Sequence, residues 1–225
     1  MSILLKKKKL EKKYIMAQQQ PYAPQSEQYK VIRTHIEFLS KSSPMKILAV
    51  TSSGRGHGTT TAVVNIGVVM AQKGIKVLLI DGNIRNPEIH LFFGKKNLHG
   101  LTDILLDPHI KANEFVIPTS VEGLNILTAG SHKIGVDIIT EELISLFNKY
   151  KQIYDLIIID CPSIVENANA QIISSSSDAS IMVIRFGKTK KEKALKAKKN
   201  LEAGGSRFIG VIGRDNKKIK KSHFF

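Results

Sequence analysis

The chain has 225 residues, 42% of them hydrophobic, which is enough for one sizeable α/β core. Its single cysteine, Cys161, excludes an internal disulfide framework, and no apolar run approaches the roughly 20 residues of a membrane helix. The net charge of +15 comes from lysine-rich runs at 1–13, 188–199 and 214–225, so the basic field of a nucleic-acid-binding domain is not indicated.

The first 25 residues are expected to form a disordered basic tail, because lysines are followed by AQQQPYAPQ with no apolar periodicity. From residue 26 on, apolar side chains recur at helical spacing until Pro44 ends the pattern. They are Tyr29, Ile32, Ile36 and Leu39. We therefore expect one folded domain over residues 26–215 and a second basic tail at 216–225.

Strands and helices are predicted to alternate through the rest of the chain. Apolar runs predict strands at 46–50, 76–81, 124–130, 154–160, 179–186 and 207–213, and helical patterns fall at 59–73, 137–150 and 191–205. Continuous apolar strands indicate burial on both faces, and their alternation with helices indicates a parallel sheet. The predicted fold class is α/β: a doubly wound, mostly parallel sheet with helices on both faces, as in P-loop NTPases.

The segment TSSGRGHGTTT follows the first strand and has the layout of a phosphate-binding loop. Glycines in such a loop let backbone N–H groups turn toward a phosphate, and the N-terminus of the following helix adds its dipole. The usual pattern has a lysine after the last glycine, whereas here that residue is Thr59. The predicted nucleotide-binding residues of the loop are Gly54, Arg55, Gly56, His57, Gly58, Thr59, Thr60 and Thr61.

One hydroxyl and two carboxylates are candidate ligands for Mg²⁺. Thr60 holds the position whose hydroxyl normally binds the metal, and Asp160 ends the strand LIII as a metal-holding carboxylate does. Asp81 ends the neighbouring strand, where a carboxylate could hold Mg²⁺ or act as a base. Ligands of such sheets bind beyond the carboxyl ends of the strands. An acid in this position can equally be a helix cap or an acceptor for loop amides.

The same glycines also allow a dinucleotide-binding interpretation. Gly54 and Gly56 follow a strand, and Asp81 ends the next one, as in the G-x-G-x-x-G fingerprint. The third glycine of that fingerprint would fall at Thr59, and Asp81 lies somewhat far along the chain.

In their order along the chain, the segments resemble the bacterial tyrosine kinases of capsule and exopolysaccharide operons, which belong to the MinD/ParA-like P-loop group. The resemblance covers roughly residues 26–215. SEQYKVIRTHIEF is similar to the oligomerisation helix of the family, whose E-x-x-R-x-x-R pattern falls on Glu27, Lys30 and Arg33. VLLIDGNIRNPEIH is similar to the family motif D-x-D-x-R-x-P, and YDLIIIDCPS also matches.

The resemblance implies an ATP-dependent protein-tyrosine kinase that uses ATP and Mg²⁺, with Asp81, Asn83 and Arg85 as catalytic residues. It also implies ring-shaped oligomers, activation by the cytosolic tail of a membrane polysaccharide co-polymerase, and modification of a C-terminal tyrosine cluster.

Several positions depart from the family pattern. The P-loop lysine is Thr59, the second acid of the D-x-D motif is Asn83, and the acid expected after the Asp160 strand is Asn169. Arg214 stands where an asparagine would read the base of the nucleotide, and the proline-rich segment has become SHKIGVD. The C-terminal sequence NKKIKKSHFF contains no tyrosine.

These departures favour a kinase-like protein with weak or lost catalysis, acting as a scaffold or modulator in exopolysaccharide synthesis. We expect a homo-oligomer or a mixed oligomer with an intact kinase, bound to ATP or ADP. The expected location is the cytoplasm, at the inner face of the membrane, where the lysine-rich runs would meet anionic lipid. One alternative is an active kinase in which Arg55 replaces the P-loop lysine. A further alternative is a MinD/ParA-like ATPase.

Overall fold

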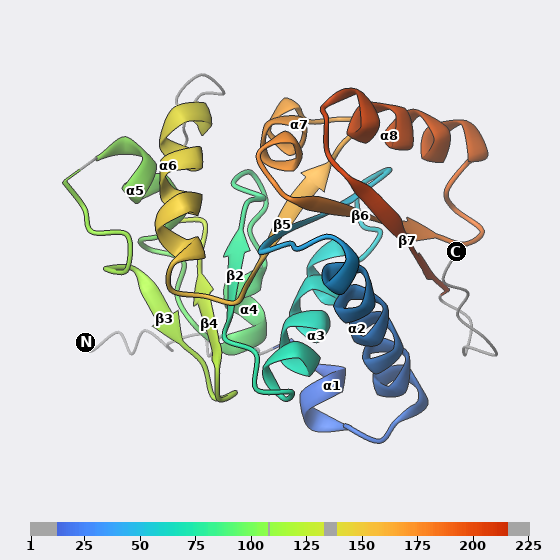
Figure 1. The fold of residues 1–225 in the computed structure, drawn as a ribbon, viewed down its shortest axis with the longest axis horizontal. Helices are drawn as coiled ribbons and strands as arrows, with labels where there is room; N and C mark the ends of the chain where they lie inside the picture. The colour runs from blue at the N-terminus through green and yellow to red at the C-terminus, as the bar shows by residue number, and fades with distance from the viewer. Residues whose placement is uncertain (1–12, 108, 133–138, 216–225) are drawn as a thin grey trace, which may run out of the picture.

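A seven-stranded sheet in the order β3-β4-β2-β5-β1-β6-β7 forms the centre of the computed structural model, which describes residues 13–107, 109–132 and 139–215 (Figure 1). Neighbouring strands are parallel except for the antiparallel pair β3 and β4. The strands are β1 (Ile47–Ser52), β2 (Val77–Asp81), β3 (Val116–Pro118), β4 (Leu124–Leu127), β5 (Leu156–Ser163), β6 (Ala179–Arg185) and β7 (Phe208–Arg214).

Helices cover both faces of this sheet, so the predicted doubly wound α/β fold is confirmed. The first face packs against α1 (Met16–Gln19), α2 (Pro24–Ser42), α3 (Thr59–Ala71) and α4 (Ile89–Phe93). The second face packs against α5 (Leu101–Leu106), α6 (Ile139–Lys151), α7 (Ala168–Ser175) and α8 (Lys191–Ala203). Figure 1 shows α1, α2 and α3 gathered on one side of the sheet and α6, α7 and α8 on the other.

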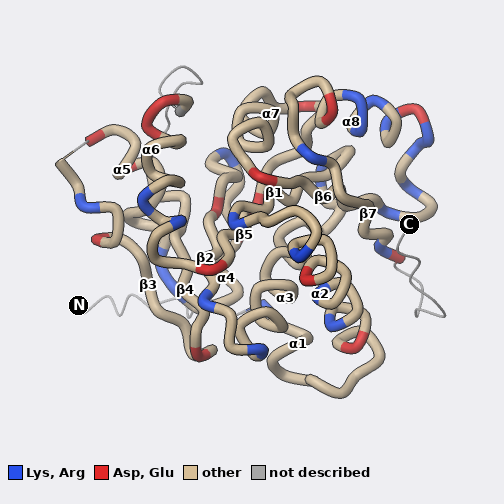
Figure 2. Tube along the Cα trace, viewed as in Figure 1, with Lys and Arg blue, Asp and Glu red and all other residues tan. Residues whose placement is uncertain are grey.

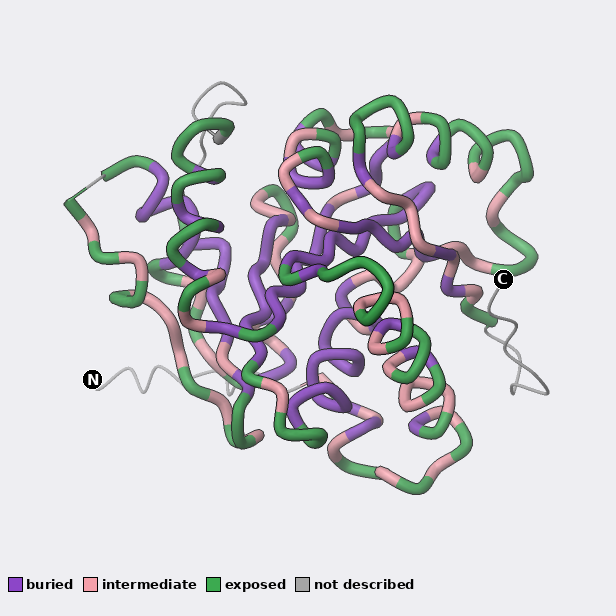
Figure 3. Tube along the Cα trace, viewed as in Figure 1, coloured by how far each residue is buried: buried purple, intermediate pink, exposed green. Residues whose placement is uncertain are grey.

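Alternate residues of the central strands enter the two cores, as the pleat of a strand requires. Leu48 and Val50 of β1 belong to the core with α3, whereas Ile47 and Ala49 belong to the core with α6 and α7. Helix α3 is apolar on nearly every side and is buried almost throughout, because it lies between the sheet and α2 (Figure 3). The phosphate-binding loop therefore leads into the most enclosed helix of this face.

The prediction of a disordered tail over residues 1–25 is wrong for residues 13–25. Ile15 and Ala17 are buried in the first core, and the backbone N–H of Ala17 donates a 2.8 Å hydrogen bond to Asn65 Oδ1 of α3. Helix α1 has only four residues and no periodicity, so its order depends on these tertiary contacts. Residues 1–12 and the predicted tail at 216–225 lie outside the described residues.

The short elements were not predicted from the sequence. Helices α4, α5 and α7 and the edge strand β3 have three to eight residues each, too few to establish a periodicity. The predicted strand at 124–130 ends at Leu127. The helix predicted at 137–150 starts at Ile139 in the described part of the chain.

Candidate functional site

The phosphate-binding loop joins the carboxyl end of β1 to the N-terminus of α3. Gly56 and Gly58 have backbone φ angles of 69° and 87°, a region that favours glycine. Gly58 is the N-cap of α3, and its carbonyl accepts the first helical hydrogen bond, from Ala62 at 3.0 Å. The N–H groups of the first helical turn have no partner within the helix, so this end of α3 favours an anion.

A cleft of about 480 Å³ lies in front of this helix end, at the carboxyl edge of the sheet. The loops after β1, β2 and β5 line it together, as the sequence predicted. The predicted site residues that line it are Gly54, Arg55, Gly56, Gly58, Thr59, Thr60, Thr61, Asn83, Arg85, Asp160 and Arg214. Two further predicted residues, His57 and Asp81, do not line the cleft.

Thr60 and Asp160 meet at the floor of the cleft. Thr60 Oγ1 donates a 2.6 Å hydrogen bond to Asp160 Oδ2, and Asp160 is 1% exposed. The other carboxylate oxygen, Oδ1, is buried and has no hydrogen-bond partner. Burial raises the pKa of Asp160 well above its usual range, and the nearby charge of Asp81 adds to this rise.

This arrangement fits Mg²⁺. The cation prefers oxygen ligands and is often held by one or two protein groups together with the phosphates of a substrate. Asp160 Oδ1 and the Thr60 hydroxyl are oxygen donors of this kind, and the orphaned Oδ1 is suited to a metal or to its water shell. Within the described ranges, no group of three or more His, Cys, Asp or Glu is arranged to hold a metal ion.

Asp81 has the contacts of a helix cap. Its Oδ2 accepts hydrogen bonds of 2.9 Å from the backbone N–H groups of Glu88 and Ile89, and its Oδ1 accepts one of 3.3 Å from Asn83. Asp81 therefore secures the loop that carries Asn83 and Arg85, and it connects this loop to the start of α4. Burial raises the pKa of Asp81 to about 7 despite these three amides. A role in metal binding or proton transfer remains a prediction.

The two arginines Arg55 and Arg214, which line the cleft, make different contacts. Arg55 forms a 3.2 Å ion pair with Glu166, and its side chain is 79% exposed. Glu166 also lies 3.8 Å from Lys193 of α8. Arg214, at the end of β7, packs against the N-cap of α3: a Cβ built on Gly58 would lie 2.8 Å from Arg214 Cζ and closer still to Nη1.

His57 does not line the cleft, and its ring lies close to Gly54. A Cβ on Gly54 would lie 3.1 Å from its ring, and its Nδ1 is 3.5 Å from Ser53 Oγ. Burial lowers the pKa of His57. Since the half-buried ring does not line the cleft, it is poorly placed to replace the missing lysine.

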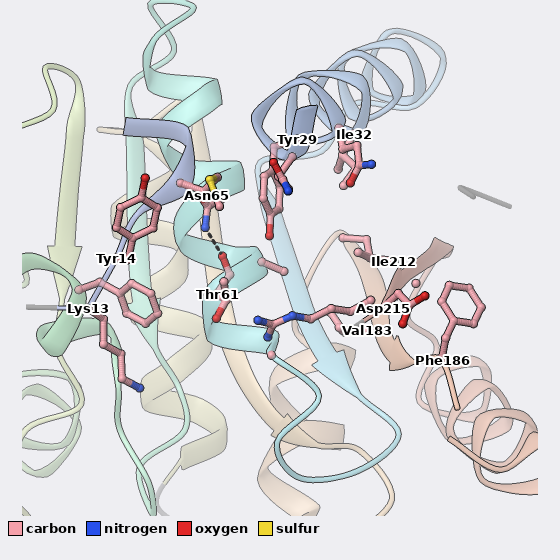
Figure 4. A pocket seen from close by; sticks show the side chains of 18 residues that line it. Lys13, Tyr14, Tyr29, Ile32, Thr61, Asn65, Val183, Phe186, Ile212 and Asp215 are labelled. Carbon is pink, nitrogen blue, oxygen red and sulfur yellow. Dashed lines mark hydrogen bonds between the residues drawn. The ribbon is translucent and has the colours of Figure 1, made fainter. Parts of the chain in front are cut away.

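A second cavity, of about 460 Å³, adjoins the cleft and shares Gly58, Thr61 and Arg214 with it (Figure 4). Its walls are largely apolar and aromatic, and they come from α1 to α4, from β6 and β7, and from the segment before α1. Figure 4 shows Tyr14, Tyr29 and Phe186 around this space. The sequence did not predict the cavity, because residue 14 was assigned to a disordered tail and only the folded chain brings it near β7.

The three predicted oligomerisation residues of α2 do not share one environment. Glu27 and Lys30 form a 2.7 Å surface ion pair. Arg33 instead donates a 3.0 Å hydrogen bond to the Val69 carbonyl of α3 and lies 3.7 Å from Glu37. Arg33 thus helps to fix α2 on α3, whereas Glu27 and Lys30 lie at the surface, and Val31 and Phe38 of the same helix are exposed.

Comparison with known proteins gives consistent results. A family described as "AAA domain" matches residues 45–192. Tyrosine-protein kinase YwqD of Bacillus subtilis is 38% identical over 93% of this chain and 89% of its own length. Tyrosine-protein kinase CpsD of Streptococcus agalactiae is 34% identical over 83% of this chain and 81% of its own length.

Solved structures agree with these relatives. The chimerical protein CapA2B2 superposes with a TM-score of 0.82 at 30% identity, over 91% of each chain. The kinase domain of the Escherichia coli tyrosine kinase ETK superposes with a TM-score of 0.86 at 23% identity, over 96% of this chain and 85% of that one. The septum site-determining protein MinD of Pyrococcus horikoshii, complexed with Mg-ADP, superposes with a TM-score of 0.66 at 24% identity, over 79% of this chain and 73% of that one. The last two show similarity of fold.

Proposed function

Because the chain belongs to the bacterial tyrosine-protein kinase family, we propose that it binds ATP or ADP with Mg²⁺ but transfers phosphate weakly or not at all. In this proposal it acts as a scaffold or modulator in capsule or exopolysaccharide synthesis. The observation that supports it is a contrast within one cleft. Thr60 and Asp160, the candidate Mg²⁺ ligands, lie together and are hydrogen-bonded, whereas the position of the P-loop lysine holds the uncharged Thr59.

The missing cation bears on transfer more than on binding. Phosphoryl transfer depends almost wholly on positioning and on charges that stabilise the transferring group. Removal of one preorganised charge contact typically slows such a reaction by about 10²–10³-fold. Backbone N–H groups at the α3 N-terminus remain able to hold phosphates without the lysine. The second acid of the family motif, replaced by Asn83, would also be a poor base for a tyrosine hydroxyl.

The two adjoining cavities suggest where the parts of a bound nucleotide lie. We assign the phosphates to the cleft in front of α3 and the base to the aromatic cavity beside Tyr29 and Phe186. Mg²⁺, when bound, would neutralise charge on the phosphates, and Thr60 and Asp160 are the residues that would hold it. Arg85 lines the phosphate side and is available for the same anion.

An active kinase that uses Arg55 is the second candidate. Arg55 lines the cleft, and its guanidinium is a permanent cation suited to phosphate. However, its ion pair with Glu166 would have to break before it could reach a γ-phosphate. A MinD/ParA-like ATPase is less well supported, since the MinD comparison shows similarity of fold and the named relatives at higher identity are kinases.

The proposal extends to partners and location. The cytosolic tail of a membrane polysaccharide co-polymerase and further copies of the chain, or an intact kinase, are the proposed protein partners. Lysines along α8 add a basic surface that suits anionic lipid at the inner face of the membrane (Figure 2). In the described residues, no helix is long and apolar enough to cross a bilayer.

Two measurements test the proposal. Titration with ADP, with and without Mg²⁺, should show binding that the metal strengthens. Incubation with radiolabelled ATP and the co-polymerase tail should show no tyrosine labelling above background. Strong labelling that disappears in Arg55→Ala would support the active-kinase alternative instead. The absence of nucleotide binding would contradict both kinase proposals.

A further inference from the structure

We propose that Arg214 is a phosphate-binding residue, in place of the base-reading role that its position in the sequence suggested. The inference rests on the proposed nucleotide binding. It means that a residue at the end of β7 supplies positive charge to the bound phosphates. In this arrangement the guanidinium of Arg214 contacts the phosphates nearest the ribose. Arg214 then supports binding of the nucleotide, and it leaves the γ-phosphate end without the P-loop cation.

The position of the guanidinium carries this assignment. It occupies the space that a side chain on Gly58 would need, with Cζ 2.8 Å and Cδ 3.0 Å from the position of that Cβ. Gly58 is the N-cap of α3, so the guanidinium lies at the helix end where phosphates are held. A residue that only reads the base would lie in the aromatic cavity alone, whereas Arg214 borders both cavities.

The charges around Arg214 also favour a bound phosphate. The N-terminus of a helix carries partial positive charge, so a guanidinium beside it is unfavourable unless an anion lies between them. No ion pair to Arg214 is found in residues 13–107, 109–132 and 139–215. Arg214 therefore differs from Arg55, whose charge is already satisfied by Glu166. A phosphate shared by Arg214 and the α3 amides would compensate both positive groups.

Arg214 also lies where the two cavities join. It lines the phosphate cleft and the aromatic cavity together with Gly58 and Thr61. Its charge reaches Tyr29, where it partly opposes the rise in the pKa of the phenol that burial causes. A nucleotide that spans the two cavities passes this junction with its α- and β-phosphates, which is why we assign Arg214 to these and not to the γ-phosphate.

Calorimetric titration with Mg-ADP at low and high salt tests the assignment in the full chain. Arg214→Gln should weaken ADP binding by roughly ten- to a hundred-fold, the range for loss of a charged hydrogen bond. The salt dependence of the remaining affinity should become shallower, because one charge contact is lost. Arg214→Lys should recover part of the affinity. Arg207→Gln, with the same change of charge at the opposite end of β7, should bind ADP as the wild type does.

The outcomes separate this inference from the proposed function. If the wild type binds no ADP, the proposed nucleotide binding fails and the role of Arg214 fails with it. If the wild type binds ADP and Arg214→Gln binds it equally well, only the phosphate contact is wrong. Weakened binding with an unchanged salt dependence would indicate contact with the base and would also overturn the assignment.

Discussion

Asp81 and Asp160 occupy paired positions on the neighbouring parallel strands β2 and β5, and both carboxylates are buried. Burial raises the pKa of Asp81 to about 7 and the pKa of Asp160 well above its usual range. Two adjacent buried carboxylates do not ionise together without a cation, so this end of the sheet favours either a proton or a metal. One member of the pair, Asp81, caps α4, and the other, Asp160, belongs to the proposed Mg²⁺ site.

The first prediction concerns the pH dependence of stability without nucleotide or metal. Because the folded-state pKa of each acid lies above its unfolded value, the contribution of this pair to stability is fully present below about pH 4. It is lost as pH rises through about 7, the folded pKa of Asp81. Urea denaturation at pH 5 and pH 8 should show a larger loss of stability at pH 8 in the wild type than in Asp160→Asn.

The comparison with the variant is necessary because two histidines affect the pH dependence of stability in the opposite direction. Burial lowers the pKa of His57 and of His90, so their contribution to stability grows as pH rises toward 6.5. Both histidines are unchanged in Asp160→Asn and cancel in the difference. An identical pH profile for wild type and variant would show that Asp160 is ionised in both states.

The second prediction concerns the hydroxyl of Thr60. Thr60→Val keeps the shape of the side chain but removes the hydrogen bond to Asp160 Oδ2 and one oxygen of the proposed metal site. Mg²⁺ should then no longer strengthen ADP binding, whereas Thr60→Ser should keep most of the effect. Titrations with and without Mg²⁺ measure both variants. A metal effect that survives in Thr60→Val would place Mg²⁺ elsewhere.

The third prediction uses two glycines with similar backbone angles and different surroundings. Ala at Gly56 or Gly58 places a Cβ in the left-handed region, which destabilises the fold by roughly 1–2 kcal/mol in each case. Gly56 has nothing within 4 Å of the new Cβ, whereas Gly58→Ala must displace Arg214. Gly58→Ala should therefore lose more ADP affinity than Gly56→Ala.

A double-mutant cycle isolates the contact between Gly58 and Arg214. In an Arg214→Ala background, Gly58→Ala has no guanidinium to displace, so its additional effect on ADP affinity should disappear. Additive effects of the two substitutions would mean that they act independently, and that the close approach has no role in binding.

The fourth prediction concerns restoration of the P-loop cation. Thr59→Lys should raise the rate of phosphate transfer to an added tyrosine-containing peptide, by up to about 10²-fold. Self-labelling at the C-terminus should stay absent, because residues 216–225 contain no tyrosine. Radiolabelled ATP with and without the peptide separates the two. If the rate does not change, the loss of the lysine is not what limits transfer, and Asn83 becomes the residue to test next.

The fifth prediction concerns the N-terminal segment. Residues 1–12 carry five lysines and one glutamate, so their deletion removes a net charge of +4. This should weaken sedimentation with anionic vesicles, most clearly at low salt, and should leave thermal stability unchanged. Deletion of residues 1–20 also removes buried Ile15, which should lower the stability by at least about 1.5 kcal/mol. Equal binding to neutral and anionic vesicles would exclude an electrostatic mechanism.

Six strands of the sheet and the edge at which the cleft lies could be predicted from the sequence. Continuous apolar runs such as 154–160 indicate strands that are buried on both faces, and their alternation with helices indicates a parallel sheet. Polar segments after such strands must then meet at one edge. For this reason Thr60, Asn83 and Asp160 were predicted to lie together, and the cleft contains all three.

The contacts of individual side chains could not be predicted from the sequence pattern. Asp81 caps α4, Arg33 donates to a carbonyl of α3, and Arg214 packs against Gly58. The metal, interface and base-reading roles suggested by the sequence stay predictions. Residues 13–17 are ordered by Asn65 and by the first core without any periodicity of their own. The periodicity of apolar residues indicates which side chains of one helix or strand face the core. The contacts described here join segments that are far apart in the chain, so they depend on how the elements are placed relative to one another.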